Sequence, residues 1–264
     1  PQDRENWMEG RSIPLMREKK SVEILYWAGC SGAYDTRGKE ISQSVTDIMD
    51  KAGVDYACLG NEETCTGDSA RRIGNEYLFQ MMAQQNKETF DQYDFKKIVT
   101  QCPHCFTTLK NDYAEMGIEL DVVHHSQFID DLIQDEKIKP RPYIDEDITF
   151  HDPCYLGRHN NEYDAPRNVL QSVLQDGSIK EMEQSKSESF CCGAGGGNMW
   201  YEIKTGDRIN QNRVEQAVST EAKTVAAACN FCNIMLEDGV KTTGNENNIK
   251  VLDIAEMVSK GLAD

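Results

Sequence analysis

The sequence lacks long hydrophobic runs and has a deficit of positive charge. Its longest apolar strings, such as residues 224–229, are as short as a β-strand and fall far below the ~18–20 residues that a membrane span needs. Only 28 lysines and arginines stand against 45 aspartates and glutamates, so the net charge is −17. This excess of acid argues against nucleic acid or an anionic lipid surface as the main partner.

No secretory signal peptide is recognisable, and the chain begins with Pro1 rather than methionine. We therefore expect either a processed product, a piece of a longer protein or a free-standing subunit. With 264 residues, 39% of them hydrophobic and 28% charged, the composition is that of a soluble globular protein of one large or two small domains.

Ten cysteines are the feature that the sequence has in excess. They could form disulfides, act as redox thiols or bind metal. Disulfides are the weakest of these interpretations, because a chain of this length needs no such cross-links and a reducing cytoplasm would open them. Adjacent cysteines and two C-x-x-C motifs also suit long-range disulfides poorly. Metal binding is therefore the leading hypothesis.

The cysteine spacings contain a repeat. Three pairs of cysteines have the same separation of 127 residues, namely Cys65 and Cys192, Cys102 and Cys229, and Cys105 and Cys232. The residues around the two C-x-x-C motifs, 98–109 and 224–236, are also alike. We therefore predict two homologous halves, with a lead-in over 1–20, a first cysteine-rich domain over 21–138 and a second over 139–264.

The pattern of short β-branched runs and longer polar-apolar stretches predicts an α/β fold. Strands are expected at 22–30, 54–60, 96–102 and 120–126, and helices at 38–52, 68–93, 127–136 and from Pro103 onward. The second half repeats the rhythm with strand-like runs at 147–154, 226–229 and 249–258. Each half should be a small parallel sheet flanked by helices. Ligands gather at the carboxyl ends of such strands, and the sequence places four cysteines there, Cys30, Cys102, Cys154 and Cys229.

The second set of cysteines is larger than zinc requires. It contains Cys154, Cys191, Cys192, Cys229 and Cys232. Four thiolates suit tetrahedral zinc or an iron–sulfur cluster, and a fifth exceeds both zinc and an ordinary cubane. Gly193, Gly195 and Gly196 follow directly and would let backbone amides approach a bulky anionic cofactor. The fifth thiol and the glycines favour a cluster over zinc, and a dinucleotide loop is disfavoured.

The first set has one cysteine fewer, comprising Cys30, Cys65, Cys102 and Cys105. The common offset aligns Cys65 with Cys192, whereas the local wording aligns Cys65-Thr66-Gly67 with Cys191-Cys192-Gly193. Both alignments remain open at this point. Cys58 falls inside an expected strand and has no counterpart in the second half, so we interpret it as a buried structural thiol.

The second set, Cys154…Cys191-Cys192-Gly193…Cys229-Asn-Phe-Cys232, resembles the CCG cysteine-rich domain of heterodisulfide reductase catalytic subunits and related iron–sulfur oxidoreductases. Segments 26–38, 65–80, 101–113, 151–160 and 190–200 are similar to the C-terminal half of membrane-associated reductases of the electron-transfer-flavoprotein:menaquinone type. The resemblance implies a non-cubane [4Fe–4S] cluster on the five cysteines of the second set. Because the first set lacks the double cysteine, a cubane [4Fe–4S] cluster is expected there, with zinc in place of one cluster as the alternative.

The resemblance also implies a function. The chain would pass electrons from a flavoprotein or ferredoxin-type donor to a disulfide or quinone acceptor, in the cytoplasm and peripheral to the membrane through a haem- or quinone-binding partner or domain. Two alternatives stay open: an electron-transfer module without its own substrate site, and a scaffold in which one cysteine set holds structural zinc.

Several other residues are candidates for supporting roles. His124, His125 and His151 could donate protons to a substrate or be satisfied structural histidines. We expect His104, inside the first C-x-x-C motif, to be a partly exposed residue at a helix N-terminus. Five arginines near the motifs could raise the potential of an anionic cluster or form surface ion pairs: Arg71, Arg72, Arg158, Arg208 and Arg213.

Overall fold

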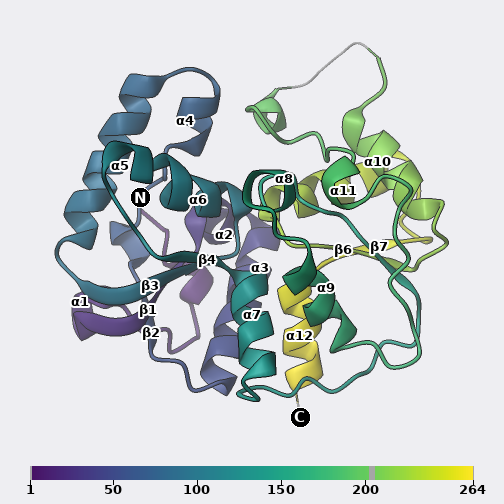
Figure 1. Ribbon diagram of the computed structural model, residues 1–264, viewed down its shortest axis with the longest axis horizontal. Coiled ribbons are helices and arrows are strands. Elements are labelled where there is room, and N and C mark those ends of the chain that lie inside the picture. Colours follow the sequence, from purple (N-terminus) through teal and green to yellow (C-terminus); the bar gives the residue numbers. More distant parts are fainter. Residues whose placement is uncertain (1, 202–205, 264) are drawn as a thin grey trace.

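The computed structural model describes residues 2–201 and 206–263 and confirms an α/β fold with two parallel sheets (Figure 1). The first sheet has the strand order β2-β1-β3-β4, and every pair is parallel. Its strands are β1 (Ser21–Trp27), β2 (Tyr56–Cys58), β3 (Asp94–Thr100) and β4 (Val122–His124). Strand β1 lies inside the sheet and is fully buried from Leu25 to Trp27, as expected for a parallel strand covered on both faces.

The second sheet repeats three of these strands. Its parallel order is β5-β6-β7, with β5 (Ile148–Phe150), β6 (Thr224–Ala227) and β7 (Lys250–Asp253). This order matches β1-β3-β4 of the first sheet. A single parallel bridge between Ile148 and Ile179 stands where β2 stands in the first half. The two halves are therefore built on one plan, and the second replaces an edge strand with irregular chain.

Helices cover both sheets. In the first half they are α1 (Met16–Lys19), α2 (Gly29–Tyr34), α3 (Thr36–Lys51), α4 (Asp68–Arg72), α5 (Glu76–Phe90), α6 (Pro103–Thr107) and α7 (His125–Gln134). In the second half they are α8 (Gly157–Asn160), α9 (Asp164–Gln171), α10 (Ile209–Val218), α11 (Asn230–Thr242) and α12 (Ile254–Leu262). Short 3₁₀ turns occur at Asn6–Met8, Gly60–Glu62, Ala114–Met116, Lys186–Glu188 and Asn198–Trp200, and a π-helical turn follows α6 at Thr108–Asp112.

Two expected elements are corrected by the structure. The helix expected over 68–93 is two helices, because Gly74 adopts a left-handed φ of +86° and the side chain of Asn75 accepts a hydrogen bond from the Leu78 amide at 3.1 Å, which starts α5 afresh. The strand-like run 249–258 is a strand only as far as Asp253. There the Asp253 side chain accepts from the Ala255 amide and begins α12.

The halves meet along helices in the centre of the molecule, where α3 and α7 of the first half lie beside α9 and α12 of the second (Figure 1). Arg37 on α3 pairs with Glu237 on α11, with its Nε 2.7 Å from the carboxylate, and with Glu256 on α12. His125 at the start of α7 lies 2.9 Å from Asp253 at the start of α12. These contacts bring the cysteine-bearing ends of the two sheets toward each other.

Candidate metal centres

All four cysteines of the first set line one cavity. Cys30 lies in the first turn of α2, Cys65 precedes α4, Cys102 caps α6 and Cys105 lies within α6. The thiols of Cys30 and Cys65 are hydrogen-bonded to each other, as are those of Cys102 and Cys105. Three separate strand-end loops thus deliver four sulfurs to one place, which four-thiolate metal binding requires.

Gly29 is shaped by this site. It has a left-handed φ of +75°, and a Cβ atom there would lie 3.2 Å from the sulfur of Cys105. A side chain would therefore be strained by the backbone and would press on the thiol. The glycine lets the chain pass close to the sulfurs before it turns into α2.

The paired thiols differ in acidity. The hydrogen bond from Cys30 lowers the pKa of Cys65 to about 6, and the same bond together with burial raises the pKa of Cys30. Cys65 is therefore the thiol of this pair that ionises first, and the thiolate is the form that binds metal.

The structure also brings the five cysteines of the second set together. Cys154 follows β5, Cys191 and Cys192 lie in the loop before the glycines, Cys229 caps α11, and Cys232 lies in its first turn. The sulfurs of Cys192 and Cys232 are 3.2 Å apart. Further thiol hydrogen bonds join Cys154 to Cys191, Cys191 to Cys192 and Cys229 to Cys232. Hydrogen bonds from Cys154 and Cys192 strongly lower the pKa of Cys191.

The amide contacts decide how the two sets correspond. The Gly193 amide donates to the sulfur of Cys191 at 3.2 Å, and the Gly67 amide donates to the sulfur of Cys65 at 3.4 Å. Both glycines have left-handed φ angles, +94° and +88°. Cys65 therefore corresponds to Cys191, and Thr66, which is buried, stands where the second set has Cys192. The thiol that the first set lacks is the counterpart of Cys192.

Buried polar atoms around the sites suit a cofactor larger than a single ion. Beside the first set, the Ser31 hydroxyl and the Trp27 indole N–H have no hydrogen-bond partner among the described residues, and both side chains line the same cavity. In the second set the side-chain amide of Asn230, between Cys229 and Cys232, is likewise unpaired. Unpaired buried donors are costly in a folded protein. The inorganic sulfides of an iron–sulfur cluster would accept their hydrogen bonds, so the residues fit such a group.

His151 lies directly against the second set. One of its ring nitrogens and the sulfurs of Cys192 and Cys232 all lie within 4.8 Å of one another. Its Nδ1 accepts a hydrogen bond of 3.0 Å from Nε of Arg213, and both side chains are buried. Burial lowers the pKa of His151 well below its usual value. Burial also lowers the pKa of Arg213 to about 10, so that side chain stays charged at neutral pH.

The loop that leads into Cys191 is held by arginines. Arg213 donates to the Gln184 carbonyl at 2.9 Å and to the Ser189 hydroxyl at 3.1 Å. Arg158 donates to the carbonyl oxygens of Ser187 and Ser189. The other three arginines singled out in the sequence form ion pairs: Arg71 and Arg72 with Asp112, and Arg208 with Asp238 at 3.0 Å. The two proposed roles for these arginines are therefore divided among them.

His104 lies between the two cysteine sets, and the expectation that it would be partly exposed is wrong. It is buried, and its Nδ1 is 2.9 Å from the Asp68 carboxylate. Its ring stacks on Tyr155 with centroids 3.9 Å apart and meets Phe231 edge-on at 4.9 Å. Tyr155 follows Cys154, and Phe231 lies inside the second C-x-x-C motif. A residue of the first motif therefore contacts two segments that carry ligands of the second.

His124 and His125 lie at the contact between the halves. Both are fully buried. His124 contacts the Ser126 hydroxyl at 2.8 Å and the Gln101 carbonyl at 3.3 Å, and His125 joins His124 to Asp253. Burial lowers the pKa of His124 well below its usual value. Neither histidine, nor His151, lines the cavity described next.

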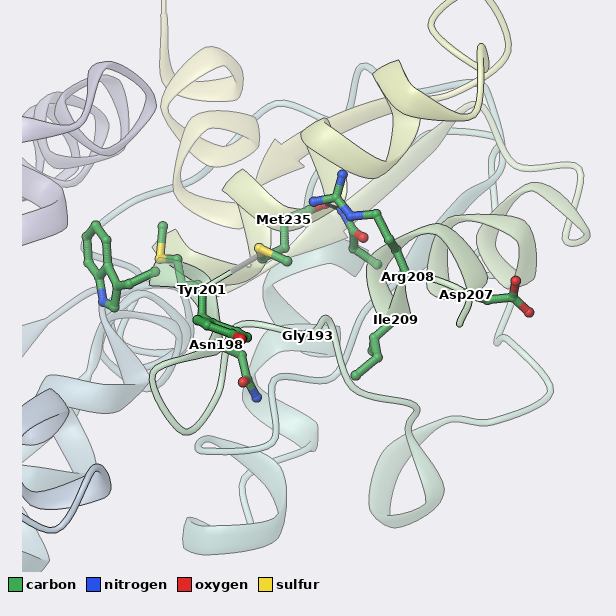
Figure 2. Close-up of a pocket in the computed structure, with 10 residues that line it drawn as sticks. Gly193, Asn198, Tyr201, Asp207, Arg208, Ile209 and Met235 are labelled. Atoms are coloured by element: carbon green, nitrogen blue, oxygen red, sulfur yellow. Dashed lines mark hydrogen bonds between the residues drawn. The ribbon is translucent and has the colours of Figure 1, made fainter. Parts of the chain in front are cut away.

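A cavity of about 310 Å³ opens beside Gly193 (Figure 2). Its walls are mainly thioether, aromatic and aliphatic side chains, with Asp207 and Arg208 at one side; the apolar ones are Met199, Trp200, Tyr201, Ile209 and Met235. A Cβ atom on Gly193 would lie 3.3 Å from both Ile209 and Met235, so this glycine is needed where the cavity meets the cysteine pair. Gly195 and Gly196 belong to the same loop and have no such close neighbour. The cysteine pattern did not point to these walls; their only signal in the sequence is the aromatic pair that follows the glycines.

Comparison with known proteins agrees with the geometry. The family model described as "CCG: Cysteine-rich domain" matches residues 24–110 and 148–237, once in each half. The chain belongs to the CCG cysteine-rich domain family. Each match includes its half's cysteine set, and the two matches fit the tandem repeat.

Curated relatives of this CCG protein are redox proteins. It is 41% identical to the probable iron–sulfur-binding oxidoreductase FadF of Bacillus subtilis and 41% identical to the EtfAB:quinone oxidoreductase of Syntrophomonas wolfei, in each case over 98% of this chain and 38% of the relative. It is 34% identical to one subunit of the dihydromethanophenazine:CoB–CoM heterodisulfide reductase of Methanosarcina barkeri, over 94% of this chain and 61% of that relative. The chain thus spans about two fifths of the length of the first two relatives. These names support an iron–sulfur redox role, and none supports zinc.

Solved structures resemble the chain weakly. The glutamate racemase RacE1 of Bacillus anthracis aligns at 15% identity with a TM-score of 0.38, over 92% of this chain and 80% of its own. That likeness is too low to bear on fold or function. Within the described residues, no helix is both long and apolar enough to cross a bilayer.

Proposed function

We propose that this CCG protein is the electron-transferring part of an iron–sulfur reductase, in which electrons enter at the first cysteine set and leave from the second. The observation that carries the proposal is the contact between the sets. His104 lies within the first C-x-x-C motif and packs on Tyr155 and Phe231, the neighbours of Cys154, Cys229 and Cys232. Protein-mediated electron transfer needs such close packing between its centres.

Two [4Fe–4S] clusters are the cofactors that we propose. A cubane would be held by Cys30, Cys65, Cys102 and Cys105, and a non-cubane cluster by Cys154, Cys191, Cys192, Cys229 and Cys232. Thr66 in the place of Cys192 supports this difference, because the first set has four thiols and the second has five. When bound, the clusters would supply storage for single electrons, and the protein would set their potentials and their access to partners.

The acceptor site that we propose is the cavity beside Gly193. Its thioether and aromatic walls suit a flat, largely apolar molecule such as a quinone, which takes up two electrons and two protons to become a quinol. A disulfide is the second candidate, and it would take up two electrons and two protons to give two thiols. Both classes occur in the names of the relatives, as a quinone oxidoreductase and a heterodisulfide reductase subunit. The apolar walls favour the quinone.

The donor in this proposal is a flavoprotein or a ferredoxin-type protein. The name of the Syntrophomonas relative, EtfAB:quinone oxidoreductase, supports a flavoprotein. That relative is more than twice as long as this chain, and another relative is named a probable membrane-anchored ferredoxin. We therefore propose that the chain works in the cytoplasm, next to a membrane-associated partner or domain that carries haem or binds quinone.

The test is reoxidation of the reduced protein by each acceptor class. Anaerobic protein loaded with iron and sulfide is reduced with dithionite, freed of excess reductant and mixed with menadione or with a small aromatic disulfide in a stopped-flow spectrometer. We expect menadione to restore the oxidised spectrum at least tenfold faster than the disulfide. Slow reoxidation by both would contradict the acceptor proposal, and faster reaction with the disulfide would favour the second candidate.

Variants assign the reaction to a cysteine set. Cys192→Ser removes the thiol that joins the second set to Cys232, so we expect it to lose the second cluster signal, keep the first and lose at least tenfold in reoxidation rate. Cys58→Ala is the matched control, because Cys58 is buried in β2 outside both sets. It should keep both signals and react like the wild type. Retention of both clusters in Cys192→Ser would sink the ligand assignment.

A further inference from the structure

Arg213 is a buried cation that no carboxylate balances. Its guanidinium is fully shielded from solvent, and its hydrogen bonds go to neutral acceptors: Nδ1 of His151, the Gln184 carbonyl, the Gln216 side-chain oxygen and the Ser189 hydroxyl. Among the described residues, no aspartate or glutamate forms an ion pair with it. A buried charge without a partner is strongly destabilising. An anionic group on the adjacent cysteines would supply the missing partner.

The nearest acid does not fill this role. Asp152 is buried, and it is committed to Arg167, whose two terminal nitrogens lie 2.7 and 3.0 Å from its carboxylate oxygens. It also accepts from the Lys186 amide at 2.8 Å. Arg167 extends the pair to Glu181 at the surface. The Asp152 charge is therefore neutralised by a different arginine, and the charge of Arg213 remains.

The first half is built differently at the equivalent places. The offset of 127 residues that relates the two C-x-x-C motifs relates Arg213 to Asn86, which is buried and neutral and holds the Cys65 carbonyl at 2.9 Å. The buried cation beside the first set is Arg4, and it forms an ion pair with the buried Glu63. Glu63 in turn accepts from the amides of Ala28 and Gly29. Arg4 therefore differs from Arg213 in having a buried carboxylate that balances its charge.

His151 lies between Arg213 and the thiols of the second set. In a neutral imidazole one nitrogen carries the proton and the other accepts. Because Arg213 donates to Nδ1, the proton of a neutral His151 is at Nε2. The guanidinium thus fixes the tautomer of a ring that lies within 4.8 Å of two sulfurs. Trp27 occupies the same place in the first set, three residues before the leading cysteine.

We propose that Arg213, with His151 as its hydrogen-bonded neighbour, raises the reduction potential of the cluster on the second cysteine set above that of the first and so directs electrons from the first set to the second. The inference rests on the proposed function, since it assumes a cluster in each set. A fixed positive charge stabilises the form with one more electron, and it acts strongly where solvent is excluded. Arg213 is a positioning residue in this scheme and does not touch the acceptor.

The test is a redox titration monitored by electron paramagnetic resonance, performed on the loaded protein. The signal that Cys192→Ser lacks is assigned to the second set. In the wild type we expect the second cluster to have the higher midpoint potential. In Arg213→Gln we expect its reduction equilibrium to weaken at least tenfold, which is a fall of about 59 mV or more for one electron, while the first cluster stays unchanged. Arg213→Lys keeps the charge and should recover most of the shift.

The control is Arg208→Gln, which removes an exposed arginine of the same segment that already pairs with Asp238. It should move the second potential much less than Arg213→Gln does. Equal shifts in these two variants, or a wild-type second cluster with the lower potential, would overturn the inference. If Arg213→Gln fails to hold its cluster, the wild-type order of potentials and the Arg213→Lys variant still decide. Absence of iron from the wild type would instead overturn the proposed function.

Discussion

At the scale of single residues, the histidines show how burial changes a role. His124, His125 and His151 are all potential proton donors by residue type, and all three are enclosed by the protein. His124 is held by a hydroxyl and a backbone carbonyl, and its pKa lies well below the usual value because burial disfavours the charged ring. Such a histidine is built to stay neutral, and this has a consequence for stability.

We predict that the protein loses stability as the pH falls below about 6.5, and that His124 accounts for part of the loss. The unfolded chain binds a proton at this histidine below its ordinary pKa, whereas the folded protein does not. The free energy of unfolding therefore falls with decreasing pH, by up to about 1.4 kcal/mol per pH unit for each such group. In His124→Gln the fall between pH 7.5 and 5.5 should be smaller by about 1 kcal/mol or more.

Anaerobic urea unfolding at several pH values measures this difference. His159→Gln is the matched control, since His159 is exposed and solvent reduces the effect of its surroundings. It should keep the pH dependence of the wild type. An unchanged slope in His124→Gln would show that this histidine takes up its proton in the folded protein.

At the scale of elements, the starts of helices do more than end strands. Helices α7 and α12 begin at equivalent places after β4 and β7, with His124 and Asp253 as their capping residues. The Asp253 carboxylate caps α12 through the Ala255 amide at 2.9 Å, and it also accepts from His125 at 2.9 Å and from Asn233 at 3.0 Å. One buried side chain therefore joins a helix cap, the C-x-x-C helix α11 and the opposite half.

We predict that Asp253→Ala lowers the free energy of unfolding by about 3 kcal/mol. Loss of the cap costs about 1 kcal/mol, and the buried polar groups of His125 and Asn233 lose their partner at ~1–3 kcal/mol each, so 3 kcal/mol is near the lower end of that range. Asp35→Ala is the control, because Asp35 caps α3 through the Gly38 amide at 2.9 Å and is not part of such a network. It should cost about 1 kcal/mol. Similar losses in the two variants, measured by urea unfolding, would contradict a linking role for Asp253.

The sequence predicted the elements whose periodicity is strong and missed the contacts between them. Strand-end placement of Cys30, Cys102, Cys154 and Cys229 was correct, because parallel sheets put strand ends on one edge. The break at Gly74 was missed, since the amphipathic pattern continues across it. The neighbours of the second set could not be predicted, because Arg213 lies 21 residues beyond Cys192 and reaches His151 only through the tertiary fold.

At the scale of the whole molecule, the repeat explains both the likeness and the difference of the two sites. Each half places a C-x-x-C helix start and a cysteine loop at the same edge of a parallel sheet, and the halves join through α3, α7, α9 and α12 (Figure 1). Divergence has then acted at single positions. Thr66 replaces a thiol, and Asn86 stands where the second half has Arg213. One plan thereby yields two thiol sets with different ligand counts and different surrounding charge.

The central claim is that both sets hold iron–sulfur clusters, and one measurement tests it most directly. The protein is purified without oxygen, and iron, acid-labile sulfide and zinc are determined per chain, with Cys192→Ser and Cys58→Ala beside the wild type. The account predicts about eight iron and about eight sulfide in the wild type and in Cys58→Ala, and about four of each in Cys192→Ser, as two four-iron clusters require. Zinc without iron in the wild type would contradict it.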